Sequence, residues 1–190
     1  MARLFLVFGT HGAGKTTVLR GLRSAKIVNM GSELFRLYSK KFSITSRDQI
    51  HAKSLSNYGY LVKARNRIIR RISKAAGPVV IDTHAADKRG DGYVVGLSFS
   101  DLNVMKGKAR AIIYIDASNA QILKRRQKDA AVRNREKDTD EGLSMDRNIS
   151  LAFVALFSLY LEVPMYIVQN EDGKLKETQL RIEEIIRNTR

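Results

Sequence analysis

The residues with the clearest chemical potential lie near the start of the chain, in the stretch GTHGAGKTT. It matches the pattern G-x-x-x-x-G-K-[ST], follows an apolar run and opens a predicted helix, TTVLRGLRSA. In such a loop, glycines let backbone N–H groups converge on phosphate oxygens, with the positive end of the helix behind them. Lys15 is predicted to neutralise the β- and γ-phosphates of a nucleotide, and the Thr16 hydroxyl to bind Mg²⁺. We expect the whole loop to contact the nucleotide: Gly9, Thr10, His11, Gly12, Ala13, Gly14, Lys15, Thr16 and Thr17.

A carboxylate that could act with this loop follows a second apolar run, GPVVIDTH. The run ends at Asp82, which is predicted to orient Mg²⁺ or its water ligands; the alternative is an aspartate that caps the following loop. We expect His84 in a pocket wall, and His11 beside the phosphates rather than as a base. The histidines His11, His51 and His84 show no zinc-ligand spacing, so no metal-ligand role is expected for them.

The third stretch with chemical potential is RRQKDAAVRNRE, Arg125 to Glu136, which holds five cations. On a helix, Arg126, Asp129 and Arg133 would share one face. Three interpretations are open: a nucleic-acid contact, a solvated helix face, or a lid that closes arginines over phosphates. Cations delivered from a moving segment would stabilise the charge that develops in phosphoryl transfer and would exclude water. The stretch alone does not decide between the three.

Five apolar, β-branched runs are expected to position these residues. They are continuous rather than alternating, which is typical of strands buried on both faces of a parallel sheet. Helical segments separate them, so a three-layer α/β fold is predicted. The runs are RLFLVF, KIVNM, PVVID, RAIIYID and PMYIVQ.

Helix boundaries are predicted from capping and periodicity. Capping boxes are expected to open helices at Ser46 and at Ser118. Residues 60–76 are predicted to form a helix that ends at Gly77-Pro78. The apolar segment 151–161 is predicted to lie in the core, with a subunit interface as the alternative. One face of the 60–76 helix carries Leu61, Ala64, Ile68 and Ile72.

Composition limits the class of protein. With 190 residues and 44% hydrophobic content, one α/β domain spanning 1–190 is expected. Neither a signal peptide nor a run of about 20 apolar residues is present, so a soluble, cytoplasmic protein with no membrane association is expected. The absence of cysteine excludes disulfides and a thiol nucleophile. The net charge of +15 fits nucleic acid or small polyphosphates and does not decide between them.

Over nearly its whole length the chain resembles the archaeal-type adenylate kinases, a branch of the P-loop nucleoside monophosphate (NMP) kinases. The resemblance rests on GTHGAGKTT, IDTHAADKRGDGYVVGLS, RRQKDAAVRNR and YIVQNEDG. It implies a P-loop NTPase fold with a five-stranded parallel sheet of order 2-3-1-4-5, an NMP-binding insertion at about 30–75 and a short lid at about 125–142. It also implies reversible phosphoryl transfer from MgATP to AMP, and assembly as a homo-oligomer, commonly a trimer.

The resemblance also implies roles for particular residues. The basic stretch is interpreted as the lid, and backbone around Gln169 to Gly173, including Asn170, is expected to flank the adenine of ATP. The implied catalytic cations are Lys15, Arg126, Arg133 and Arg135. Candidate acceptor contacts are Arg36, Arg47, His51, His84, Lys88, Arg89 and Tyr93.

The chain departs from the family pattern mainly on the acceptor side. His51 stands where relatives commonly have an arginine, and Ser32 replaces the usual acidic residue. Val95 and Ser98 occupy positions of expected prolines, and Asp129 lies one residue nearer to Arg126 than the pattern places it. The departures keep two alternatives open: an ATPase or kinase with another acceptor or an RNA- or ribosome-linked role, and a nucleotide-binding module without turnover.

Overall fold

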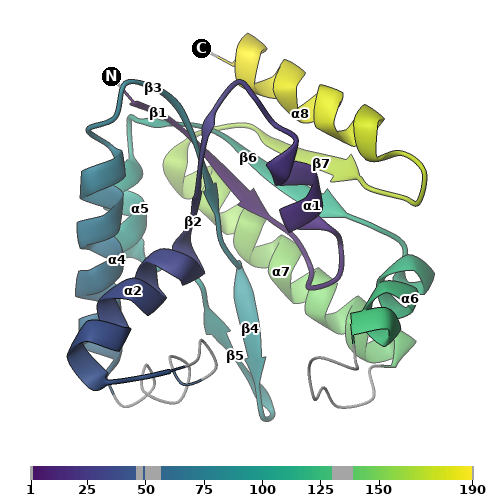
Figure 1. Cartoon of the computed structure of the whole chain (residues 1–190), viewed down its shortest axis with the longest axis horizontal. Coiled ribbons are helices and arrows are strands. Elements are labelled where there is room, and N and C mark those ends of the chain that lie inside the picture. Colours follow the sequence, from purple (N-terminus) through teal and green to yellow (C-terminus); the bar gives the residue numbers. More distant parts are fainter. Residues whose placement is uncertain (1, 46–48, 50–56, 130–138, 190) are drawn as a thin grey trace.

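The computed structural model describes residues 2–45, 49, 57–129 and 139–189. At its centre lies a five-stranded parallel sheet (Figure 1). Each strand coincides with a predicted apolar run to within a residue or two at its ends, so the predicted α/β fold is confirmed. The spatial order is β2 (Lys26–Asn29), β3 (Gly77–Asp82), β1 (Ala2–Phe8), β6 (Ala109–Asp116) and β7 (Met165–Gln169).

This order equals the predicted 2-3-1-4-5 when only the strands of the main sheet are counted. The labels differ because an unpredicted antiparallel hairpin intervenes between β3 and β6. Its strands are β4 (Ala86–Arg89) and β5 (Gly92–Val95), and Figure 1 shows it extending from the end of β3 at which Asp82 lies. The hairpin therefore reaches past the edge of the sheet where parallel strands present their carboxyl ends.

Successive side chains of β1 enter two different cores, which produces the three layers. Leu4, Leu6 and Phe8 pack with α2, α4, α5 and α7, whereas Phe5 and Val7 pack with α1 and α8. Figure 1 shows α1 and α8 on the opposite side of the sheet from α7. The helices are α1 (Lys15–Arg20), α2 (Met30–Phe42), α4 (Tyr58–Ile72), α5 (Phe99–Met105), α6 (Asn119–Asp129), α7 (Asp140–Leu161) and α8 (Leu175–Asn188).

The helix predicted at 60–76 is α4, and its predicted apolar face is buried. It ends at Ile72, earlier than predicted, because single turns at Lys74 and Ala75 follow before Gly77 (φ +79°) begins β3. Arg65 lies on the same buried face, where its Nε donates to Asp101 Oδ2 of α5 at 2.8 Å. An ion pair therefore lies within the apolar contact between α4 and α5.

The predicted capping box at Ser118 is wrong, although α6 does begin at the next residue. The Ser118 N–H and hydroxyl donate to the Glu171 carboxylate at 2.7 and 3.1 Å, so the loop after β7 supplies the acceptors. The structure forms a capping box at Ser98 and Asp101 instead, at the start of α5. The box predicted at Ser46 lies outside the described residues.

The apolar segment 151–161 forms the second half of α7 and is only partly in the core. Val154, Phe157 and Leu161 are buried, but Leu156 is 42% and Leu159 76% exposed. The helix lies along one face of the sheet, so only one of its stripes can contact the strands. Among the described residues, no helix combines the length and the apolar character needed to cross a membrane.

Candidate nucleotide-binding site

The predicted phosphate loop connects β1 to α1, as its spacing requires. Gly9 has φ +149°, and a Cβ there would lie 2.1 Å from the Ile115 carbonyl oxygen, so only glycine lets the loop pass this close to β6. Lys15 is buried, and its Nζ donates to the Gly9 carbonyl at 2.6 Å. Burial lowers the Lys15 pKa from its usual value, and the carboxylates of Asp82 and Asp87 oppose that shift. A desolvated cation therefore lies inside the loop.

Asn170 fixes the other side of the loop. Its Nδ2 donates to the Ala13 carbonyl at 2.7 Å, and its N–H donates to the Asp116 carbonyl at 2.8 Å. A Cβ at Gly14, which has φ +85°, would lie 2.4 Å from that Nδ2, so glycine is needed here as well. Asn170 was expected beside the nucleotide; in the structure it also ties the segment after β7 to the phosphate loop.

The predicted Mg²⁺ residues offer the oxygen donors that this ion prefers. Thr16 opens α1 and is exposed, while Asp82 ends β3 and is buried. Asn29 Nδ2 donates to Asp82 Oδ2 at 2.7 Å and holds the carboxylate in place. Asp82 acts electrostatically on Lys15, which places it beside the loop. The donor set therefore fits Mg²⁺.

The basic stretch begins on α6, which is packed against the phosphate loop. Arg126 Nε donates to the His11 carbonyl at 2.8 Å, and a Cβ at Gly12 would lie 3.2 Å from Arg126 Cγ. Arg125 Nη2 donates to the Asn170 carbonyl at 2.9 Å and to Asp172 at 2.8 Å. The structure therefore places both arginines at the nucleotide loop. The predicted lid residues Arg133 and Arg135, and the side chain of Asp129, lie outside the described part of the chain.

The acceptor candidates are placed in several different settings. His84 follows β3, exposed Lys88 lies on β4, and Arg89 Nη2 lies 3.4 Å from the Asp87 carboxylate. Tyr93 Oη donates to Asp146 Oδ1 at 2.5 Å; burial, followed by this bond, raises the Tyr93 pKa to about 12. The hairpin and α7 thus hold Tyr93 as a neutral donor.

Arg36 is placed differently from the hairpin candidates. Its Nη2 pairs with Glu33 at 3.0 Å, and it lines a cavity with Lys26, at the opposite end of β2 from Asn29. Arg47 and His51 fall outside the described residues. The structure thus brings His84, Lys88, Arg89 and Tyr93 together near the hairpin and does not bring Arg36 to them.

Two departures from the family pattern have local structural roles. The Ser32 N–H and hydroxyl both donate to Asn29 Oδ1 at 2.8 Å, so Ser32 completes the N-terminal cap of α2. Ser98 caps α5 through its hydroxyl. Ser98 therefore satisfies a backbone N–H at a helix start, whereas the Ser32 hydroxyl holds the Asn29 side chain that does so for α2.

Reasoning from the sequence missed three acidic residues at the site. Asp116 is buried at the end of β6, and its Oδ2 lies 3.3 Å from Arg147 Nε. It follows the run RAIIYI as Asp82 follows PVVI, so the same signal could have found it. Asp146 and Asp87 had no comparable signal, because neither follows an apolar run and their contacts with Tyr93 and His11 join segments distant in sequence.

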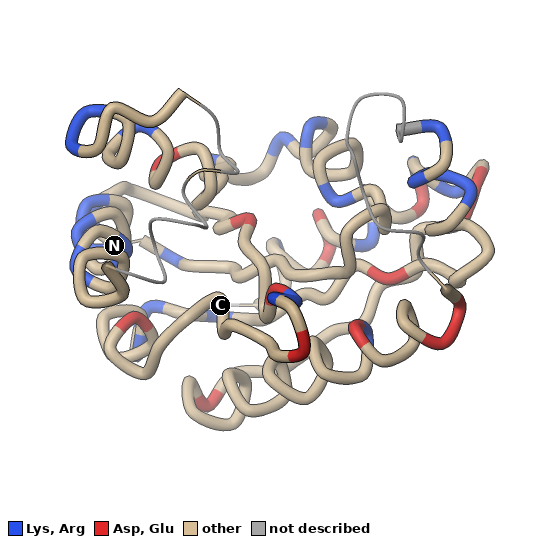
Figure 2. The backbone as a smooth tube through the Cα atoms, turned by 90° about the horizontal axis from the view of Figure 1, so that it is seen from below, with Lys and Arg blue, Asp and Glu red and all other residues tan. Residues whose placement is uncertain are grey.

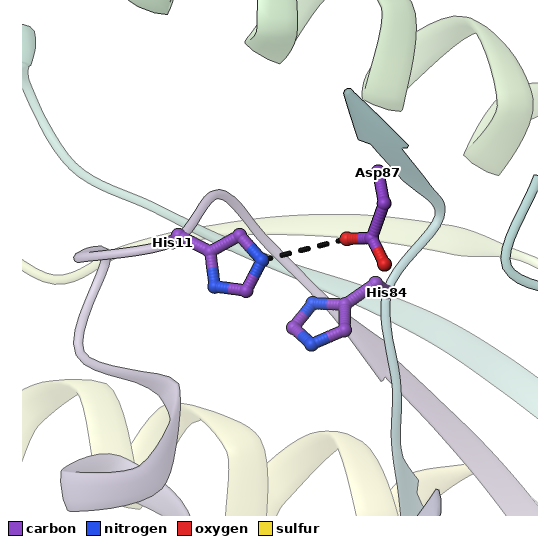
Figure 3. Close-up of side chains that lie close together, drawn as sticks. All are labelled: His11, His84 and Asp87. Atoms are coloured by element: carbon purple, nitrogen blue, oxygen red, sulfur yellow. Dashed lines mark hydrogen bonds and ion pairs between the residues drawn. The ribbon is translucent and has the colours of Figure 1, made fainter. Parts of the chain in front are cut away.

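The histidines form a group that their spacing did not predict (Figure 3). His11 Nε2 lies 3.5 Å from Asp87 Oδ1, and the His11 and His84 ring centroids are 4.3 Å apart. One ligand atom from each of His11, His84 and Asp87 lies within 4.8 Å of the other two. The structure therefore brings two of the three histidines and an aspartate together, which their spacing in the sequence did not indicate.

The fold and the site define a P-loop kinase. The sheet is parallel and of this order, a phosphate loop joins β1 to α1, an aspartate ends β3, and an arginine-bearing helix packs on the loop. In agreement, residues 8–144 match the family model described as AAA domain. A shikimate kinase from Acinetobacter baumannii superposes with a TM-score of 0.57 at 16% identity, covering 98% of this chain and 93% of that one. This likeness supports the fold alone.

Similarity to known proteins shows which kinases this chain is related to. An adenylate kinase of Thermoplasma acidophilum is 34% identical over 89% of this chain and 90% of its own length. The adenylate kinase of Pyrobaculum aerophilum is 34% identical over 79% of this chain and 77% of its own length. That of Pyrococcus abyssi is 26% identical over 98% of this chain and 96% of its own length. The chain belongs to the AAA domain family and, within it, to the archaeal adenylate kinases, as its motifs predicted.

Proposed function

We propose that the protein transfers a phosphoryl group reversibly from MgATP to AMP, giving two ADP. The observation that carries this proposal is the buried Lys15 inside a glycine loop to which Arg126 is bonded, in a chain related to adenylate kinases over most of its length. Transfer is direct and in line, and no covalent enzyme intermediate or general base is required.

On this proposal, Lys15 exchanges the Gly9 carbonyl for the β- and γ-phosphates when ATP binds. Arg126, with Arg133 and Arg135 from the lid at about 125–142, stabilises charge on the transferred group and excludes water. Mg²⁺, held by Thr16 and oriented by Asp82, neutralises phosphate charge when bound. The segment at Asn170 flanks the adenine.

We place AMP in the region of about 30–75, facing the hairpin. Its α-phosphate needs cations, which Lys88 and Arg89 provide near the loop and which Arg47 and His51 provide from the insertion; Arg36, at the other end of β2, is not part of this site. Tyr93 and His84 form the wall on the hairpin side. This part of the proposal rests on the family resemblance and on the position of β4 and β5.

A coupled assay that offers AMP, GMP, CMP and UMP separately tests the reaction. We expect the highest rate with AMP, whereas equal and near-zero transfer to all four would overturn the proposal. A titration with two adenosines joined by five phosphates tests the geometry. Tight binding requires donor and acceptor pockets that face each other, so weak binding comparable to that of ATP would contradict it.

A second candidate function, linked to RNA, is favoured by the exposed side of α4. Five cations lie on that helix and its end, and Figure 2 shows Lys and Arg on the helix beside the N label. Such a surface supplies affinity for phosphate backbones. The candidate predicts ATP hydrolysis unaffected by AMP and RNA binding that weakens steeply with salt. The cations are Lys63, Arg67, Arg70, Arg71 and Lys74.

Assembly and location are proposed from the same resemblance. Relatives of this branch are commonly trimers, and the exposed apolar side of α7 at Leu156 and Leu159 could form a subunit contact. We propose a homotrimer that acts on nucleotides in the cytoplasm.

A further inference from the structure

We propose that His11, His84 and Asp87 form a binding site for a divalent transition-metal ion of the zinc or cobalt class. The site is separate from the Mg²⁺ residues Thr16 and Asp82. It joins the phosphate loop, the segment after β3 and strand β4, which lie far apart in sequence (Figure 3).

The spacing of the ligand atoms fits such an ion. With metal–nitrogen and metal–oxygen bonds of about 2.0–2.2 Å, two ligand atoms of a tetrahedral ion lie about 3.3–3.5 Å apart. His11 Nε2 and Asp87 Oδ1 are already 3.5 Å apart, and all three ligand atoms lie within 4.8 Å of one another. Small side-chain rotations would complete the set.

The chemistry of the donors selects the class of ion. Two imidazoles and one carboxylate suit Zn²⁺, Co²⁺ or Ni²⁺, whereas Mg²⁺ prefers oxygen ligands and keeps its water. Three protein ligands would leave a coordination position for water or for a phosphate oxygen. His11 is exposed, and His84 and Asp87 are half-buried, so an ion can reach the group from solvent.

The backbone around the three residues is held before any ion binds. The His11 carbonyl accepts from Arg126 Nε at 2.8 Å. The Gly96 N–H donates to the Ala85 carbonyl at 2.8 Å, and a Cβ at Gly96 would lie 1.7 Å from the His84 carbonyl oxygen. The close return of the chain after β5 therefore fixes the His84 segment. Such support favours metal binding, because the ligands lose little freedom on coordination.

An ion at this position would also change the electrostatics of the phosphate loop. The Asp87 carboxylate acts on Lys15 and therefore places negative charge opposite the cradle that receives phosphates. A bound divalent cation would offset this charge and would link the loop to the hairpin.

The test is a titration of the nucleotide-free, untagged protein with Co²⁺ in millimolar Mg²⁺, followed by visible ligand-field absorption and by calorimetry. We expect one Co²⁺ per chain, displaced by Zn²⁺ and unaffected by Mg²⁺. His11→Ala and Asp87→Asn should each weaken binding by about tenfold or more. Asp91→Asn, at an exposed aspartate in the turn of the same hairpin, should bind as the wild type does.

Circular dichroism and the melting temperature of each metal-free variant separate loss of a ligand from loss of the fold. The proposal is overturned if the wild type binds no Co²⁺, if Mg²⁺ displaces it, or if both ligand variants, folded, keep wild-type affinity. Because no nucleotide is present, the result does not depend on whether the protein turns over AMP.

Discussion

Lys15 is buried inside a loop whose geometry suits a phosphate ligand. Burial lowers its pKa, the charges of Asp82 and Asp87 counteract the shift, and its Nζ donates a hydrogen bond to the Gly9 carbonyl at 2.6 Å. Removing a cation from water is costly unless it is paired. The two carboxylates and the carbonyl favour the ammonium form inside the loop, and a phosphate oxygen could replace the carbonyl as its partner.

Replacing Lys15 therefore tests the donor site directly. We expect Lys15→Ala to reduce phosphoryl transfer by about 100-fold or more, because the cation acts on the group being transferred. Steady-state kinetics with ATP and AMP measure the effect, and Lys176→Ala on the exposed side of α8 is the control. If a folded Lys15→Ala variant kept the wild-type kcat, the role assigned to Lys15 in phosphoryl transfer would be wrong.

At the scale of elements, the pairing of α4 with α5 depends on one buried ion pair. The Arg65 and Asp101 side chains are 3% and 0% exposed, and Asp101 also accepts from the Ser98 N–H and hydroxyl. Arg65 Nη2 and Asp101 Oδ1 have no hydrogen-bond partner in the described part of the chain. The pair therefore fixes how the two helices meet more than it adds to stability.

Breaking this pair should be costly, because it leaves the Asp101 carboxylate buried without its partner. We expect Arg65→Met to lower the free energy of unfolding by about 3–5 kcal/mol, measured by urea denaturation. The exposed Arg67 on the same helix provides the control, and Arg67→Met should change the free energy of unfolding by less than about 0.5 kcal/mol. Equal effects of the two substitutions would show that the pair is not needed for the α4–α5 contact.

The middle of α8 and the loop after α1 are joined by a contact that depends on pH. Burial opposes ionisation of Glu183, but bonds from the Ser24 hydroxyl and from the N–H groups of Arg23 and Ser24 hold its pKa below the usual 4.5. A carboxyl with a depressed folded-state pKa stabilises the fold above its unfolded pKa, and the contribution is lost as the pH falls through the folded-state value.

We therefore expect Glu183→Gln to lower the melting temperature at pH 7, with a difference from the wild type that shrinks as the pH falls below about 4.5. Differential scanning fluorimetry from pH 3 to 7 measures it. Glu184→Gln removes an exposed carboxylate of the same helix and should have little effect. A difference that grows toward low pH would contradict the assigned direction of the pKa shift.

The strands show which elements the sequence could predict and which it could not. Continuous apolar runs such as RAIIYID predicted every strand of the main sheet, because strands buried on both faces leave no room for polar residues. The hairpin was missed because its strands are four residues each and half-exposed, so they carry no hydrophobic pattern.

Within the site, the sequence predicted residues that belong to short local motifs, but it did not predict contacts between distant segments. The phosphate loop and Asp82 follow from short motifs whose geometry is set by neighbouring residues. The approach of His11 to Asp87 depends on where β4 turns after leaving the sheet, and that of Tyr93 to Asp146 depends on how α7 packs against the hairpin. Neither quantity is encoded in a local spacing.

At the scale of the whole molecule, the outer side of α7 is apolar and exposed. Val154, Phe157 and Leu161 contact the core, while a second apolar stripe faces outward at helical spacing. A stripe of this kind is more apolar than packing against the sheet requires, and burial of Leu159 against another chain would be favourable. The stripe consists of Ala152, Ala155, Leu156 and Leu159.

We expect the double substitution Leu156→Lys and Leu159→Lys to convert the proposed trimer to monomers, because two charges would have to be buried in each contact. Size-exclusion chromatography with light scattering measures the mass at several protein concentrations. Leu180→Lys places a charge at an isolated leucine of α8 that is 66% exposed, and it should leave the assembly intact. A wild type that is monomeric throughout, or a double variant that stays trimeric, would show that this side of α7 is not the subunit contact.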